Sequence, residues 1–154
     1  MQAGQTIPDF DLPTDGEKRL TKRDLLGKWT ILYFYPKDNT PGCTTQAVNF
    51  SAHMDEIRKL GAQVVGVSKD SPKSHDKFIA KHELKFHLIS DENGELCESF
   101  GVWVEKNMYG KKYMGIERST FLINPDGVVE LVWRKVKVKV HVNEVLEALK
   151  SAQS

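Results

Sequence analysis

Apolar, strand-like runs alternate with amphipathic, helix-like segments along most of this chain, and that alternation limits the possible folds more than any other feature. Residues 30–36, TILYFYP, are almost all β-branched or aromatic, as in a strand that is buried on both faces. Strands that are joined through helical crossovers run parallel. The pattern predicts strands at 30–36, 63–70 and 85–91, and helices at 44–60, 71–84 and 92–103.

The last third of the chain departs from this alternation. Residues 118–123 and 128–133 are strand-like and are joined by NPDG, a type I turn sequence, so they are predicted to pair antiparallel. Residues 105–116 are polar and contain glycine, which indicates a loop. The strict alternation of 134–140, RKVKVKV, indicates a solvent-facing extension of the preceding strand. With a final helix at 141–150, the expected fold class is α/β, a mixed central sheet flanked by helices.

The size and composition are those of an ordinary globular protein. Residues 1–154 are expected to form a single domain, with an extended lead-in over 1–20 and a helical turn within 21–29. The 22 Lys and Arg residues balance 21 Asp and Glu residues, so charge gives no reason to expect nucleic acid or a membrane surface as a partner. The absence of a signal peptide and of a disulfide framework predicts a cytoplasmic location.

Cys43 lies at the predicted start of a helix, one turn before Ala47 on the same apolar stripe. The first amide groups of a helix lack intrahelical partners and favour an anion, and the thiolate is the reactive form of cysteine. An unperturbed thiol is only about 3% ionised at pH 7. Reaching about 90% takes about 3.4 kcal/mol, whereas a helix terminus supplies at most about 2 kcal/mol. A neighbouring cation, most simply an arginine, must supply the rest.

The alternative is that Cys43 is a small apolar residue packed at a helix end, as buried cysteines usually are. Its neighbours favour a chemical role. Thr40 can donate a hydroxyl hydrogen bond to a ligand or to the sulfur, Pro41 stiffens the backbone, and Gly42 allows close approach to the main chain. A packing cysteine needs none of these features.

The stretch FYPKDNTPGCTT resembles the signature of peroxiredoxins, with Pro36, Thr40 and Cys43 at its fixed positions. The TPGCT form is similar to the Q-type branch, the bacterioferritin comigratory proteins. The likeness extends nearly from end to end, through PDFDLP, LISDENGELCESFGVW and RSTFLINPDG. It implies a thioredoxin-like fold.

The resemblance also implies a reaction, the reduction of hydrogen peroxide and organic hydroperoxides by a cysteine that becomes a sulfenic acid. Cys43 matches the nucleophile, and Thr40 the residue that binds the peroxide and the sulfur. Pro36 matches the residue that shields the pocket from water, and Arg118 the arginine that stabilises the thiolate and the developing oxygen charge. No cofactor or metal is implied. The expected partners are a hydroperoxide and a thiol reductant (thioredoxin, glutaredoxin or glutathione), and the expected assembly is a monomer or weak dimer.

The sequence departs from the family at the residues that would resolve the sulfenic acid. Many Q-type members carry a second cysteine where this chain has Val48, and others carry it near Ile79. The usual glutamate of the signature is Gln46. Cys97 remains as a possible resolving residue, although it also reads as a core residue. The predicted order of preference is an external thiol, then a Cys43–Cys97 disulfide, then an intermolecular disulfide.

Two other functions are alternatives to the peroxidase. A thioredoxin-like disulfide reductase needs a second cysteine at position 46, which is Gln46. A non-catalytic redox sensor or holdase on the same fold is the remaining alternative, and consumption of peroxide separates it from an enzyme. His82 and His87 have no cysteine pair beside them and are expected to be solvated side chains rather than metal ligands.

Overall fold

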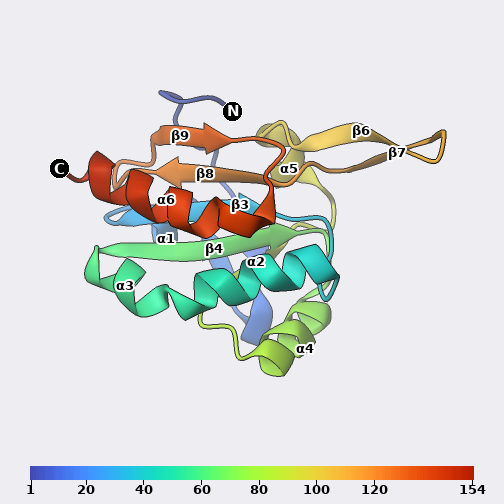
Figure 1. Cartoon of the computed structure of the whole chain (residues 1–154), viewed down its shortest axis with the longest axis horizontal. Coiled ribbons are helices and arrows are strands. Elements are labelled where there is room, and N and C mark those ends of the chain that lie inside the picture. The colour runs from blue at the N-terminus through green and yellow to red at the C-terminus, as the bar shows by residue number, and fades with distance from the viewer.

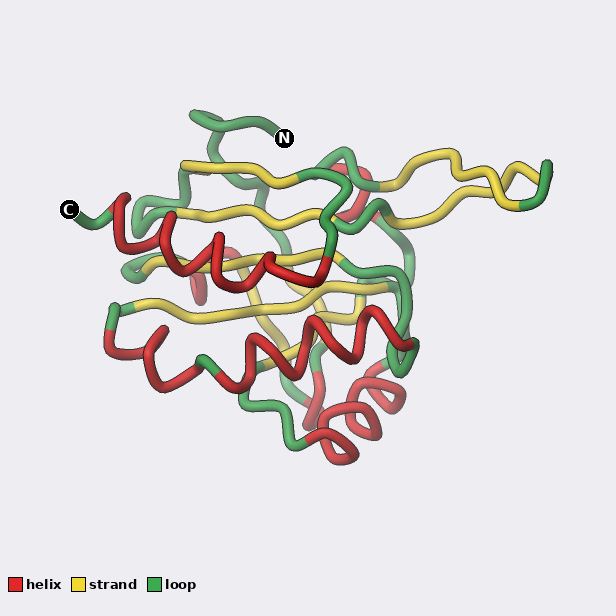
Figure 2. Tube along the Cα trace, viewed as in Figure 1, coloured by secondary structure: helices red, strands yellow, loops and turns green.

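A five-stranded mixed sheet forms the centre of the protein in a computed structural model that describes residues 1–154 (Figures 1 and 2). The strand order is β5-β4-β3-β8-β9. β3 pairs parallel with β4, and β4 with β5, whereas β3 with β8 and β8 with β9 are antiparallel. The predicted mixed sheet is confirmed. Its strands are β3 (Trp29–Phe34), β4 (Ala62–Ser68), β5 (His87–Ser90), β8 (Ser119–Ile123) and β9 (Val129–Trp133).

Helices cover both faces of this sheet, because successive side chains of its strands point to opposite sides. Ile31 and Tyr33 enter one core, and Leu32 and Phe34 enter the other. The α2/α6 core also contains buried side chains of α2 (Pro41–Ala52), α3 (Met54–Lys59), α4 (Pro72–His82) and α6 (Val138–Ala152). The α1/α5 core contains those of α1 (Lys22–Leu25) and α5 (Glu95–Ser99).

The predicted helix at 44–60 is two helices. α2 begins at Pro41, which its fixed φ suits to the first helical position, and ends before His53. His53 has φ −103° and ψ 9°, outside helical values, and α3 starts after it. The early start matters for function, because it places Cys43 within the first turn of α2.

The predicted loop at 105–116 is wrong. These residues form most of an antiparallel hairpin, β6 (Trp103–Met108) and β7 (Lys111–Ile116), whose strands pair only with each other. Tyr109 and Gly110 connect them with φ of 53° and 78°, as in a type I′ turn. The hairpin extends away from the sheet in Figure 1. The strands were not predicted because their sequence is polar and because Tyr-Gly is not one of the common hairpin turn dipeptides.

The predicted strand extension at 134–140 is also wrong. β9 ends at Trp133, Lys135 adopts φ 50°, and α6 begins at Val138. The Val136 amide donates to the carbonyl of Arg118 at 2.9 Å, so this connection lies directly beside the start of β8. The alternation of lysine and valine suggested the two-residue period of a strand, but these residues form a turn followed by the first turn of α6.

The N-terminal lead-in contains more structure than predicted. β1 (Asp11–Pro13) and β2 (Arg19–Thr21) form a small antiparallel pair around the 3-10 turn η1 (Asp15–Glu17). Thr6 and Thr14 form single β-bridges to Val128 and Ile89, which attach this segment to the central sheet. No helix in the structure is long and apolar enough to span a membrane.

Candidate active site

Cys43 lies in the first turn of α2, with its side chain in the α2/α6 core and only 2% of its surface exposed. Thr40 is the N-cap, and the first intrahelical hydrogen bond runs from the Thr44 amide to the Thr40 carbonyl at 2.8 Å. The amides of Gly42 and Cys43 therefore have no intrahelical acceptor. Together with the helix dipole they create a local field that favours a negative charge at the sulfur.

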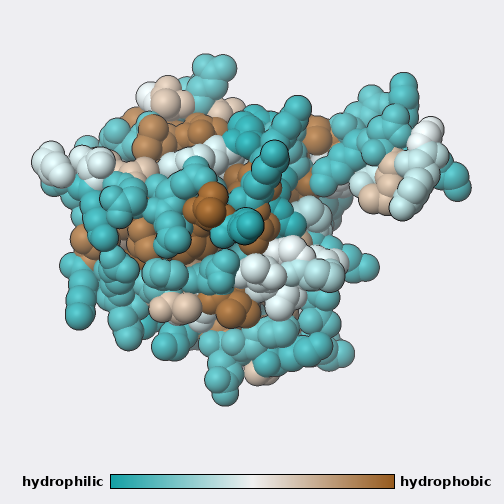
Figure 3. Space-filling model, viewed as in Figure 1, coloured by the Kyte–Doolittle hydropathy of each residue, from teal (hydrophilic) through white to brown (hydrophobic).

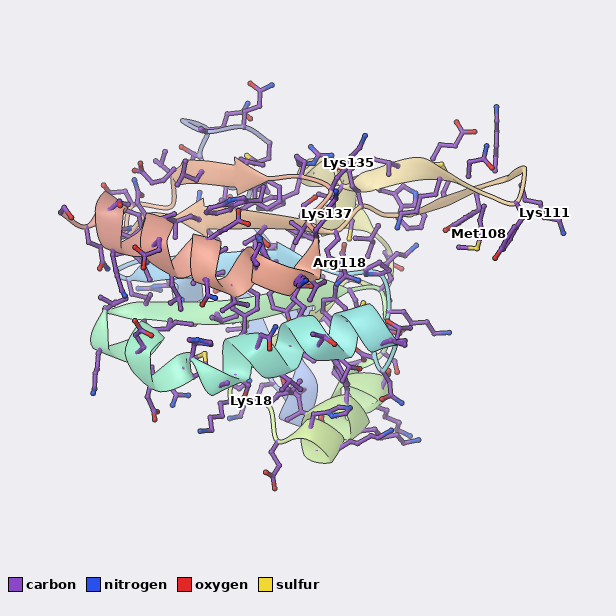
Figure 4. All side chains as sticks on the ribbon, in the orientation of Figure 1. Lys18, Met108, Lys111, Arg118, Lys135 and Lys137 are labelled. Carbon is purple, nitrogen blue, oxygen red and sulfur yellow. The ribbon has the colours of Figure 1, made fainter.

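Arg118 supplies the cation beside this sulfur. Its Nη2 donates to Cys43 Sγ at 3.2 Å, although the two residues are 75 positions apart in the sequence. Figure 4 shows Arg118 between the first turns of α2 and α6. A Cβ at Gly42 would lie 3.3 Å from Nη2, so a larger residue there would crowd the guanidinium. Gly42 thus admits the arginine that the electrostatic argument requires.

Gln46 orients the same guanidinium. Its Oε1 accepts a hydrogen bond from Arg118 Nη1 at 2.7 Å, one helical turn after Cys43, and its side chain is fully buried. The Nε2 of Gln46 has no hydrogen-bond partner. Because an amide is neutral, it fixes the arginine without an opposing charge, so the positive charge of Arg118 is left to act on the sulfur.

Thr40 and Pro36 lie on the loop that leads into α2, but neither has a hydrogen bond to the sulfur. The Thr40 hydroxyl donates to the carbonyl of Lys37 at 2.9 Å, and the oxygen keeps lone pairs for a ligand. Thr40 is half-buried, whereas Pro36 is exposed. The structure therefore brings Cys43 and Arg118 into contact and places Thr40 and Pro36 in the adjoining loop.

Three further ionisable side chains surround the pair. Burial, and after it the charge of Cys43, raises the pKa of Tyr33 well above its ordinary value, and its hydroxyl is buried without a partner. Burial and then Arg118 lower the pKa of His141 to about 4, so its ring is neutral. Burial and then Arg118 also lower the pKa of Lys106, which belongs to β6 of the hairpin. Arg118 is thus the principal cation that contacts the sulfur.

Cys97 is remote from this arrangement. It is fully buried in the α1/α5 core, on the opposite face of the sheet from Cys43, and both cysteines are free thiols. Burial, followed by a hydrogen bond to Asp91 and the charge of that residue, raises the pKa of Cys97 far above the ordinary thiol value. A disulfide between the two would require the sheet or its covering helices to open.

A buried polar network holds the loop before Cys43 in place. Asp38, five residues upstream, accepts hydrogen bonds from Tyr35 at 2.5 Å, from Ser74 at 2.8 Å and from His75 Nδ1 at 2.7 Å. His75 is fully buried, and its Nε2 faces the carbonyl of Ile89 at 3.0 Å. Both ring nitrogens therefore face oxygen atoms, so the buried ring links the loop before Cys43 to β5.

Replacing His75 by leucine is expected to lower the free energy of unfolding by about 3–5 kcal/mol, because the buried Asp38 carboxylate loses its His75 partner and keeps only the hydroxyl donors of Tyr35 and Ser74. Urea unfolding at neutral pH, followed by circular dichroism, measures this change. The double variant His75→Leu/Asp38→Ala removes both partners and is expected to recover part of the loss. A loss below about 1 kcal/mol in the single variant would contradict the buried pair.

Sequence reasoning missed Gln46, Tyr33, Asp38 and His75 as parts of the site. Gln46 carried a usable signal, since it lies three residues after Cys43 and so on the same side of the helix. The other contacts join segments far apart in the chain.

His82 and His87 lie near Asn39 and Asp15 respectively, and no group of three or more His, Cys, Asp or Glu side chains is placed to hold a metal ion.

Comparison with known proteins places the chain among close relatives. A model of the AhpC/TSA family matches residues 3–132. The peroxiredoxin Bcp of Xanthomonas campestris is 54% identical over 144 residues, which cover 92% of this chain and 90% of the relative. The peroxiredoxin Bcp of Bacillus subtilis is 49% identical over 150 residues, which cover 97% of this chain and 96% of the relative.

Solved structures agree over nearly the whole length. Peroxiredoxin Q of Xylella fastidiosa superposes with a TM-score of 0.96 at 43% identity, covering 100% of this chain and 98% of that one. The bacterioferritin comigratory protein of Xanthomonas campestris, whose trapped intermediate and ligand complexes concern alkyl peroxide reduction, superposes with a TM-score of 0.90 at 50% identity, covering 94% and 92%. The thioredoxin-like fold class predicted from the sequence is confirmed.

Proposed function

This chain belongs to the AhpC/TSA family, in its Q-type peroxiredoxin branch, and from that premise we propose that it is a thiol-dependent peroxidase whose nucleophile is Cys43. The single observation that carries the assignment of the site is the 3.2 Å contact between Arg118 Nη2 and Cys43 Sγ at the start of α2. A guanidinium donor contacts one buried sulfur there, in the first turn of a helix whose dipole favours negative charge, as a thiolate nucleophile requires.

The first step is attack of the Cys43 thiolate on the terminal oxygen of a hydroperoxide. The S–O bond forms as the O–O bond breaks, the sulfur is oxidised to a sulfenic acid, and the departing alkoxide or hydroxide takes up a proton. Arg118 faces the sulfur and is placed to stabilise the negative charge that moves to the oxygens. We assign the Thr40 hydroxyl to binding the peroxide, and Pro36 to limiting water at the mouth of the site.

An external thiol is proposed to reduce the sulfenic acid. Cys97 is buried on the opposite face of the sheet, and Val48 and Ile79 occupy the positions where relatives carry a second cysteine. The high pKa of Cys97 further disfavours it as an attacking thiolate. Alkyl hydroperoxides, as in the Xanthomonas relative, and hydrogen peroxide are the proposed substrates. Two free buried thiols fit a reducing cytoplasm, and we propose a monomer or weak dimer.

Intact mass spectrometry after one equivalent of hydrogen peroxide tests both parts of the proposal. The protein is expected to gain the mass of one oxygen, because the sulfenic acid has no second thiol within reach. A loss of two hydrogens would instead show an internal disulfide and overturn external resolution. Cys43→Ser is the control and is expected to keep its original mass. An unchanged mass in the wild-type protein, with the peroxide unconsumed, would contradict the peroxidase itself.

A further inference from the structure

A polar cavity of about 340 Å³ lies between α4 and the loop that leads to Cys43. Lys73, Lys77 and Lys81 line it from α4, and Lys37 and Asn39 line it from the loop. The three helical lysines are four residues apart, so they share one face of α4. We call this site, with its four lysines at positions 37, 73, 77 and 81, the lysine cavity. Figure 3 shows a predominantly hydrophilic surface over α4.

The lysine cavity carries an excess of positive charge, with four lysines against the carboxylates of Asp38 and Asp70. None of its four lysines forms a salt bridge, and Lys81 Nζ donates a long hydrogen bond to Asn39 Oδ1 at 3.4 Å. Neither carboxylate forms a salt bridge with a lysine, since Asp38 pairs with His75, and Asp70 accepts from the Asp38 amide and the Ser68 hydroxyl. Lysines spaced by four residues repel each other and weaken a helix. Such a stripe costs stability that an anionic ligand would offset.

The lysine cavity is connected to the reactive cysteine through the backbone. Its wall at 37–39 leads directly into Thr40, the N-cap of α2, and the Thr40 hydroxyl donates to the Lys37 carbonyl. A larger cavity lies between α3 and the strands β4 and β5, but no residue of this loop lines it. A ligand in the lysine cavity would therefore rest on the segment that carries Cys43.

We propose that the lysine cavity binds the carboxylates of a small anionic thiol, of the glutathione type, and delivers it to oxidised Cys43. The inference rests on the proposed function, which requires an external thiol. A volume of about 340 Å³ suits a small molecule rather than a protein surface. Because Cys43 is only 2% exposed, the first turn of α2 must open for the thiol to reach the sulfur.

The chemistry balances with two thiols. The first thiolate attacks the sulfur of the Cys43 sulfenic acid, the S–S bond forms, the S–O bond breaks, and the leaving hydroxide is protonated to water. The second thiolate attacks the donor's sulfur in this mixed disulfide and releases the Cys43 thiolate and the oxidised donor. The hydroperoxide is the oxidant, and the two thiols supply the electrons.

The test compares thiols of different charge on protein that has first been oxidised with one equivalent of peroxide. Glutathione is the anionic probe and 2-mercaptoethanol the neutral one. The variant Lys73→Glu/Lys77→Glu is expected to lower the rate constant for glutathione at least about tenfold, because it reverses the field of the cavity. The rate constant for 2-mercaptoethanol, and that for the first reaction with peroxide, are expected to change by less than about twofold.

Lys111→Glu/Lys112→Glu is the matched control, since it makes the same charge change at the far end of the hairpin, where Figure 4 labels Lys111. It is expected to leave both thiol rates within about twofold of the wild type. The cavity assignment is overturned if glutathione reacts equally with wild type and the cavity variant, if both thiols slow together, or if only a thioredoxin-type protein reduces the oxidised enzyme. Failure of the first peroxide step would instead refute the proposed function, so the two failures are distinct.

Discussion

Cys43→Ser is expected to abolish peroxide reduction, lowering the rate constant at least about 10⁴-fold, because a serine hydroxyl is not ionised at neutral pH and oxygen is a poorer nucleophile than a thiolate. No other thiol can replace it, since Cys97 lies in the other core. Stopped-flow measurement of peroxide consumption in a single turnover gives the rate directly. The serine hydroxyl is nearly isosteric and can accept a hydrogen bond from Arg118 in place of the sulfur, so the fold and the unfolding midpoint are expected to be retained.

Cys97→Ser is the comparison variant for this result. It is expected to leave the first turnover unchanged within about twofold, because Cys97 is separated from the site by the central sheet. Its buried position predicts a moderate loss of stability, so the two variants are compared at a temperature where both are folded. If Cys97→Ser slowed the first turnover about tenfold or more, the roles assigned to the two cysteines would be wrong.

Arg118→Met is expected to lower the rate constant for peroxide about 10²–10³-fold, because it removes the cation that contacts the sulfur and faces the developing oxygen charge. Methionine keeps much of the volume of the side chain, so the loss reports on charge and hydrogen bonding. Arg118→Lys is expected to recover only part of the rate. A lysine keeps the charge but cannot contact Cys43 and Gln46 with two nitrogens held in one plane, as the guanidinium does.

Arg134→Met provides the matched control. Arg134 pairs with Glu117 at 2.9 Å and donates to the Gly101 carbonyl, close in space to the same strand but without contact to the cysteine. Its substitution is expected to leave the peroxide rate within about twofold. An Arg118→Met enzyme that also remained within about twofold of the wild type would refute the electrostatic role of Arg118.

The contact between Cys43 and Arg118 could be predicted from the sequence because the signals around Cys43 are local. Thr40, Pro41, Gly42 and Cys43 are consecutive, and they carry the signals of a helix start and of an anion-binding first turn. The helix terminus alone cannot supply the free energy needed to ionise the thiol, so a neighbouring cation was expected. The family resemblance assigned that role to Arg118. The structure places Nη2 of that arginine 3.2 Å from the sulfur.

The contacts of the supporting residues could not be predicted, because they join segments that are distant in the chain, although the position of Gln46 on the same side of α2 as Cys43 could. Asp38 and His75 meet across 37 positions, and Gln46 and Arg118 across 72. A single sequence shows which residues share a face of one element, but not which side chain of another element packs against that face. The buried histidine in particular gave no sign that both of its ring nitrogens would face oxygen atoms.

The fold was predictable where apolar periodicity was strong and failed where side chains were polar. β3, β4 and α4 have the expected types because their residues repeat with the period of a buried strand or an amphipathic helix. The β6–β7 hairpin is held by its own backbone pairing and by positive φ at Tyr109 and Gly110, neither of which depends on apolar residues. The start of α6 was missed because lysine and valine alternate through its first turn.

The projecting hairpin gives the enzyme a convenient handle for labelling. The chain enters and leaves it at Trp103 and Ile116, which are partners in the strand register, and Tyr109 at its end is 99% exposed. A short peptide inserted between Tyr109 and Gly110, or a fluorophore attached at this turn, would change only the exposed end of the hairpin. The spacing of the five strands that hold the sulfur and the guanidinium together would be unaffected, because none of them pairs with the hairpin.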